Sequence, residues 1–143
     1  MTIRSLFASI FFAVAAAGLA ATTAHSEMIS LSAELSGANE VPPNDSAASG
    51  MAEATLDTET RMLSFSVTYE GLSGPAIGAH IHGPVGASGN AGIMIPFSTT
   101  RSPIEGSAEL TAAQVSDVLG GLTYVNIHTQ KHPGGELRGQ LAR

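Results

Sequence analysis

Histidine is the residue type whose spacing in this chain points most directly to chemistry. Four of the five histidines form two close pairs, His80 with His82 and His128 with His132. Residues two apart on a strand place their side chains on one face, about 7 Å apart at the backbone, so His80 and His82 can reach one ion. Imidazole binds several transition metals, and a site without thiolates favours copper first and zinc second.

His128 is expected to join the first pair. It ends an alternating segment in which Val125 and Ile127 point to the core, so His128 and Asn126 lie on the outer face. If the two strands are neighbours, three histidines share one site.

His132 is an optional fourth ligand. It lies four residues after His128, which is a ligand spacing on a helix, but Pro133 and the two glycines after it exclude a helix. His132 therefore lies on a turn, where it either reaches the ion or faces solvent.

Charged residues close to His128 offer two interpretations. Glu136, Arg138 and Gln140 alternate with leucines and share a face. Glu136 and Arg138 either form a solvated ion pair of little energetic weight, or Arg138 lies beside the metal and attracts a small anion. In the second case Asn126 and Glu136 are the neighbours that hold the ligands in place.

The first residues have the pattern of an export signal. A basic start with Arg4 precedes the apolar run Leu6–Ala21 and a small-residue exit, which predicts a signal peptide over residues 1–24. Cleavage after Ala24 makes His25 the N-terminus, where its imidazole and the free amine can chelate copper together. Cleavage after Ser26 fits equally well and discards His25. We expect a periplasmic or secreted protein with no membrane span after cleavage.

The remaining chain, residues 27–143, is expected to be one domain of roughly 115 to 120 residues. It is acidic, because twelve acidic residues face six basic ones and one of the basic residues lies in the leader. Nucleic acid is therefore not an expected partner. The absence of cysteine excludes thiolate metal sites, thiol catalysis and disulfides.

Alternation with period two runs through this domain and predicts an all-β antiparallel sandwich of about eight short strands. The expected strands are Ile29–Leu35, Met51–Leu56, Met62–Tyr69, Ile77–His82, Gly92–Phe97, Gly106–Leu110, Thr123–Thr129 and Glu136–Leu141. One short helix is expected after Thr111, which forms a capping box with Gln114, and it stops at Gly120.

Several separated motifs, in this order, resemble the CHRD (chordin-type) domain family. They are Glu40-Val41-Pro42-Pro43, Gly71-Leu72, Ala79-His80-Ile81-His82-Gly83-Pro84, the helix start at Thr111–Gln114, Tyr124–Thr129, and His132 to Leu141. The resemblance covers about Ile29 to Leu141. It implies a compact β-rich domain that occurs alone in exported bacterial proteins and in several copies in animal chordin. Chordin's growth-factor ligand does not transfer to a chain of this exported bacterial type.

A fainter resemblance is to copper/zinc superoxide dismutases, and it implies a Greek-key sandwich of the immunoglobulin-like or superoxide dismutase-like kind. It also implies that His80, His82 and His128 are copper ligands and that Arg138 guides an anion. The chain departs from that family because it has no bridging histidine between Gly83 and Phe97, no zinc-binding set and no cysteine. What remains is a mononuclear, copper-only site.

The first hypothesis is an exported protein that binds copper, less readily zinc, and buffers, stores or transfers the ion, with another exported metal-handling protein as its partner. The second is a copper-dependent oxidoreductase of the superoxide dismutase type. The third is an extracellular protein-interaction module that needs no metal. The missing bridging histidine places simple binding ahead of catalysis.

Overall fold

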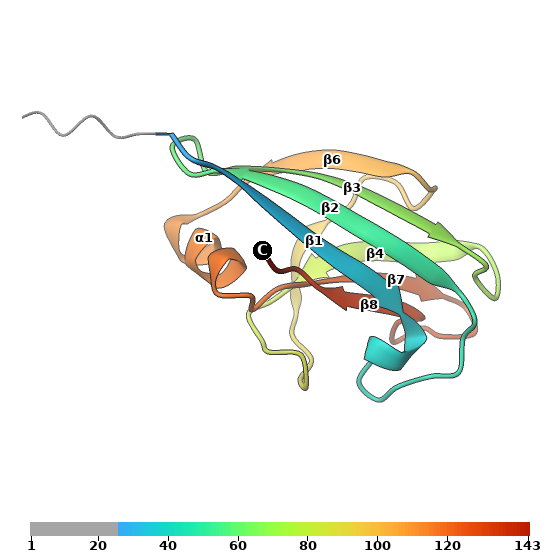
Figure 1. Cartoon of the computed structure of the whole chain (residues 1–143). Coiled ribbons are helices and arrows are strands. Elements are labelled where there is room, and N and C mark those ends of the chain that lie inside the picture. The colour runs from blue at the N-terminus through green and yellow to red at the C-terminus, as the bar shows by residue number, and fades with distance from the viewer. Residues whose placement is uncertain (1–25) are drawn as a thin grey trace, which may run out of the picture.

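The computed structural model describes residues 26–143, which form two layers of antiparallel β-strands (Figure 1). The strands are β1 (Met28–Ser36), β2 (Ser49–Asp57), β3 (Met62–Glu70), β4 (Ala76–His82), β5 (Ile93–Pro96), β6 (Ile104–Glu109), β7 (Tyr124–Thr129) and β8 (Leu137–Gln140). A 3-10 turn, η1 (Gly37–Asn39), follows β1, and the helix α1 (Ala112–Leu119) precedes β7. The predicted all-β antiparallel sandwich with one short helix is confirmed. The predicted signal peptide and His25 lie outside the described residues.

All eight strands belong to one sheet that folds over into the two layers. The strand order is β5-β4-β7-β8-β1-β2-β3-β6, and Figure 1 shows β1, β2, β3 and β6 lying over β4, β7 and β8. The layers are joined at one seam, where β1 and β8 pair at Ser36 and Arg138 and an isolated bridge links Ser32 to Ala142. The sheet curls into a nearly closed barrel. It does not close completely, because its two edge strands, β5 and β6, do not pair with each other.

Alternating burial fixes the register of the strands. In β1, Ile29, Leu31, Ala33 and Leu35 are buried and the residues between them are exposed or half-buried. Burying an aliphatic side chain of this size contributes about 1.5 to 3 kcal/mol, and a slip by one residue would turn every such side chain to the outside. In β4, Ala79 and Ile81 are buried in the core and His80 between them is half-buried, while His82 is buried on the outer face, where the 83–92 loop contacts it.

Helix α1 begins and ends where the sequence predicts. The Thr111 hydroxyl accepts a hydrogen bond from the Gln114 backbone, and the Gln114 side chain accepts one from the Thr111 backbone. Val118 is the side chain that the helix buries, and Gly121 follows with a positive φ of 69°. No helix within residues 26–143 is long and apolar enough to cross a lipid bilayer.

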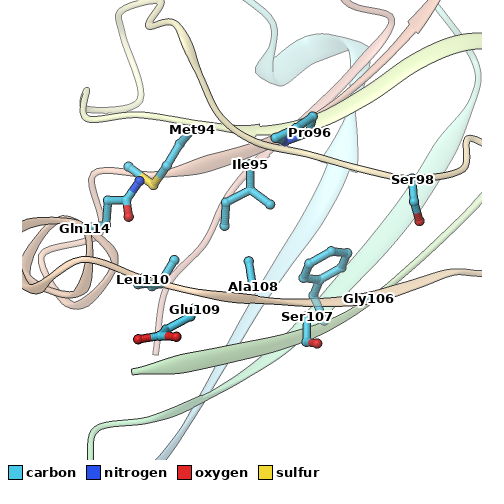
Figure 2. Close-up of a pocket in the computed structure, with 11 residues that line it drawn as sticks. Met94, Ile95, Pro96, Ser98, Gly106, Ser107, Ala108, Glu109, Leu110 and Gln114 are labelled. Carbon is cyan, nitrogen blue, oxygen red and sulfur yellow. The ribbon is translucent and has the colours of Figure 1, made fainter. Parts of the chain in front are cut away.

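The gap between β5 and β6 holds a pocket of about 340 Å³. Figure 2 shows Met94, Ile95 and Pro96 on one side of this pocket and the segment from Gly106 to Leu110 on the other. No histidine lines it. The histidines that the sequence singles out lie instead on the outer face of the layer that contains β4 and β7.

Candidate metal centre

Three histidines meet on the outer face of β4 and β7. The two strands pair antiparallel with Gly78 opposite His128 and His80 opposite Asn126, so His128 lies diagonally beside His80. One ligand nitrogen from each of His80, His82 and His128 lies within 4.8 Å of the other two, and no other such group occurs among residues 26–143. The expectation that the two histidine strands are neighbours is confirmed.

Hydrogen bonds determine which nitrogen of each ring faces the cluster. Nδ1 of His82 is 3.0 Å from the Ala91 carbonyl oxygen, and Nδ1 of His128 is 3.0 Å from the Pro133 carbonyl oxygen. A carbonyl only accepts, so both Nδ1 atoms carry hydrogen and both Nε2 atoms are acceptors. Nε2 of His128 lies 3.2 Å from Nδ1 of His80. Since the His128 Nε2 atom is the acceptor, His80 Nδ1 is the donor of this hydrogen bond within the cluster.

Among residues 26–143, four buried side-chain atoms lack a hydrogen-bond partner, and His82 Nε2 is the one that lies in the histidine cluster. The residue is only 8 % exposed, so water does not readily satisfy this lone pair. A buried polar atom left unpaired costs about 1 to 3 kcal/mol, and native structures rarely contain one without a reason. A metal ion held between the three rings would satisfy it.

The surroundings lower the pKa of all three rings and so favour their neutral form. Burial lowers the pKa of His80, and the neighbouring His128 and His82 lower it further. Burial also lowers the pKa of His82 and of His128, more than the carbonyls of Ala91 and Pro133 raise them. Only neutral imidazole binds a metal, so these shifts prepare the site for an ion at neutral pH.

Arg138 lies behind the cluster, not in front of it. Its guanidinium carbon is 3.6 Å from the centre of the Tyr124 ring, and that ring stacks on His82 at 4.9 Å with an angle of 6°. Nη1 donates to Asn90 Oδ1 at 2.9 Å and Nη2 donates to the Gly89 carbonyl at 2.7 Å. These two bonds hold the 83–92 loop, and Arg138 is only 1 % exposed, at the base of a pocket that Glu34 and Glu40 also line.

Asn126 lies on the outer face, as the sequence predicts, but it is covered by a loop. Its Nδ2 donates to Oε1 of Glu40 and to the Leu137 carbonyl. Burial raises the pKa of Glu40 to about 7, although Asn126 and the charge of Arg138 act to lower it. Asn126 therefore anchors the 37–48 loop beside the metal centre.

Glu136 is fully buried, so the expected solvated pair with Arg138 is wrong: no ion pair joins the two within the described part of the chain. Loops cover this part of the outer face. The carboxylate accepts hydrogen bonds from the hydroxyls of Ser46, Ser73 and Thr129 and from the Ser73 backbone. Burial alone would raise the pKa of Glu136, but these hydrogen bonds outweigh it and lower the pKa to about 2. Glu136 ties loops together without touching the histidines.

His132 is not part of the cluster. It lies on a turn, as predicted, with its backbone N–H bonded to Thr129 Oγ1 and its carbonyl bonded to the Gly135 N–H. Its role as a fourth ligand stays a prediction, as does that of His25, which is outside the described residues.

Sequence reasoning missed Tyr124 and Glu40 as parts of this site. Tyr124 was expected only as a strand residue, yet its ring separates His82 from Arg138 and its hydroxyl bonds to Ala91. Glu40 stands in a Glu-Val-Pro-Pro motif whose position gave no hint that it crosses to β7. Both residues lie in sequence motifs that resemble the CHRD family, and this resemblance is the signal that could have identified them.

The fold and the cluster define a β-sandwich with a three-histidine centre on the outer face of one layer. The family model of the CHRD domain matches residues 31–141, and the chain therefore belongs to the CHRD domain family. No curated protein and no solved structure is significantly similar to it. The resemblance to superoxide dismutases stays a prediction from the order of the motifs.

Proposed function

We propose that this CHRD-domain protein binds a single metal ion, copper in preference to zinc, through His80, His82 and His128. The observation that carries the proposal is the buried Nε2 of His82, which has no partner and lies in a cluster of three converging ring nitrogens. A structural role for the histidines would leave that atom unsatisfied. A bound ion accounts for it.

The donor set supports copper. The three ligands are imidazoles, and no carboxylate belongs to the cluster in the described residues. Nitrogen sites bind Cu(II) more strongly than the other divalent first-row ions, whereas hard ions such as Mg²⁺ and Ca²⁺ need oxygen ligands. Zinc is the second candidate because it accepts the same donors.

The role that we propose is buffering, storage or transfer of the ion outside the cytoplasm. It depends on the predicted signal peptide and on another exported metal-handling protein that delivers or receives copper. His80 and His128 are both half-buried, so the ion has a route in and out of the site. The placement of Arg138 weighs against a dismutase, because the guanidinium is buried behind Tyr124.

Titration of the exported protein with Cu(I), Cu(II) and Zn(II) tests the proposal. We expect one ion per chain and a loss of affinity of more than about 100-fold in the His80→Ala, His82→Ala double variant. The His132→Ala variant tests the optional fourth ligand separately: native affinity limits the site to three histidines, and a loss of affinity adds His132 to it. Mass spectrometry of the same sample establishes whether His25 is present.

Unchanged affinity in the double variant would overturn the proposal. A native protein that binds no ion, and whose melting temperature responds to neither metal nor chelator, would instead favour the metal-independent interaction module.

A further inference from the structure

A fixed positive charge lies one aromatic ring away from the metal centre. The Arg138 guanidinium and the His82 imidazole each lie directly against the Tyr124 ring, with 3.6 Å and 4.9 Å to its centre. Two groups this close to one ring cannot share a face without overlapping, so they occupy opposite faces. Tyr124 pairs with His82 on one side and with Gln140 of β8 on the other, which agrees with this order.

Within residues 26–143, no carboxylate forms an ion pair with Arg138. Its side-chain hydrogen bonds go to an amide oxygen and a carbonyl oxygen, from Asn90 and Gly89. The carboxyl group that acts on it electrostatically is that of Glu40, and burial raises the pKa of that group to about 7. At neutral pH Glu40 therefore compensates only part of the charge.

The histidine ligands add no negative charge of their own. Neutral imidazoles bind copper in either oxidation state and, unlike sulfur ligands, do not themselves select Cu(I), so any preference for Cu(I) has to come from the surroundings. The electrostatic repulsion by a fixed cation does distinguish the ions. It is twice as large for a divalent ion as for a monovalent one.

We propose that Arg138 makes this centre prefer Cu(I) over the divalent ions Cu(II) and Zn(II), and that Arg138 is the residue that determines this specificity. The inference rests on the proposed function, since it concerns the same site. It assigns the protein to the handling of reduced copper and gives Arg138 an electrostatic role at a distance. A bound copper ion would accordingly have a raised reduction potential.

Two neutral substitutions of opposite expected effect test this proposal. Arg138→Gln removes the cation and should increase the affinity for Zn(II) relative to Cu(I) by about tenfold, as one charge pair at an effective dielectric constant near 20 predicts. The same tenfold change lowers the one-electron midpoint potential of bound copper by about 59 mV. Glu40→Gln removes the partial counter-charge and should move the ratio the other way, by about threefold at pH 8.

Arg138→Lys is the matched control because it retains the charge but not the planar fork, and it should keep the native preference. The affinities are measured by competition with chromophoric chelators and the potential by redox titration. Circular dichroism establishes that each variant is folded. If Arg138→Gln does not fold, the Glu40→Gln variant still tests the sign of the effect.

The outcomes separate this inference from the proposed function. A native protein that binds neither Cu(I) nor Zn(II) refutes the metal site itself. Binding with a ratio that Arg138→Gln leaves unchanged, or that Glu40→Gln moves toward Zn(II), refutes the specificity role of Arg138 and leaves the metal site standing.

Discussion

Two backbone carbonyls decide how the ligands are presented. The Ala91 carbonyl holds Nδ1 of His82, and the Pro133 carbonyl holds Nδ1 of His128. Each bond fixes the tautomer and the ring orientation before any ion arrives. The same chain of bonds fixes His80, because the Nε2 atom of His128 can only accept and His80 Nδ1 lies 3.2 Å from it, so all three rings are held in defined orientations.

The lowered pKa values of the three histidines predict how metal binding depends on pH. A depressed pKa extends the neutral, binding-competent form to lower pH, so Zn(II) affinity should stay nearly constant from pH 8 to about 6.5. Below that range the affinity should fall by more than about tenfold per pH unit, because more than one ring takes up a proton. Chelator competition from pH 5 to 8 measures this. A decline that begins above pH 7 would contradict it.

The lowered pKa of Glu136 predicts how the folding stability depends on pH. Its pKa is about 2 in the folded protein against an ordinary 4.5, so its stabilisation is present above pH 4.5 and is lost as the pH falls toward 2. The loss should amount to about 3 kcal/mol. Urea unfolding at pH 7, 5 and 3 should show about 2 kcal/mol of this loss by pH 3 in the native protein, and a smaller one in Glu136→Gln.

Glu40→Gln is the matched comparison because the pKa of Glu40 is shifted the other way, to about 7. A raised carboxyl pKa costs stability as the pH rises from about 4.5 to 7, so Glu40→Gln should be less sensitive to pH than the native protein in that range. If both variants respond to pH alike, the opposite environments assigned to the two carboxyl groups are wrong.

At the scale of elements, the strands bring the histidines together and the loops complete the site. The 83–92 loop supplies Ala91, Asn90 and Gly89, and the loop before β8 supplies Pro133. Asn90 also donates to the Val41 carbonyl, which links the 83–92 loop to the 37–48 loop. The cover over the site is thus one connected set of hydrogen bonds.

Gly135 is the position where this cover tolerates no side chain. Its φ is 133°, and a Cβ there would overlap Glu40 and the Asn126 amide. Gly135→Ala should lower the free energy of unfolding by about 2 kcal/mol or more and weaken metal binding. Gly134→Ala is the control, because nothing lies within 4 Å of a Cβ at Gly134. Equal stability of the two variants in urea unfolding would contradict this account.

The sequence predicted the strands and the three-histidine cluster well, because both depend on alternation with period two. That rule turns Ile81 inward and both His80 and His82 outward whatever the rest of the fold does. It could not predict the environment of Glu136 or Arg138. Both side chains are buried because loops fold back over the outer face and contact them. The local sequence pattern around residues 136–140 contains no information about these loops.

At the scale of the whole molecule, binding of an ion should stabilise the fold. An ion that binds only the folded state contributes about 2.7 kcal/mol at a free concentration 100 times its dissociation constant. For a domain of this size that raises the melting temperature by about 10 °C. Calorimetry with and without Zn(II) should show the rise in the native protein and not in the His80→Ala, His82→Ala variant. A rise in both would place the ion elsewhere.

The sheet order also sets the time at which the centre is assembled. The last strand along the chain, β8, occupies an interior position between β7 and β1 and carries Arg138. Until β8 inserts, the two layers lack their seam and the 83–92 loop lacks its anchor. Nascent chains that contain all three histidines but not yet β8 therefore lack Arg138 and the anchor of the 83–92 loop, so the surroundings of the histidine cluster are complete only when the C-terminal strand is in place.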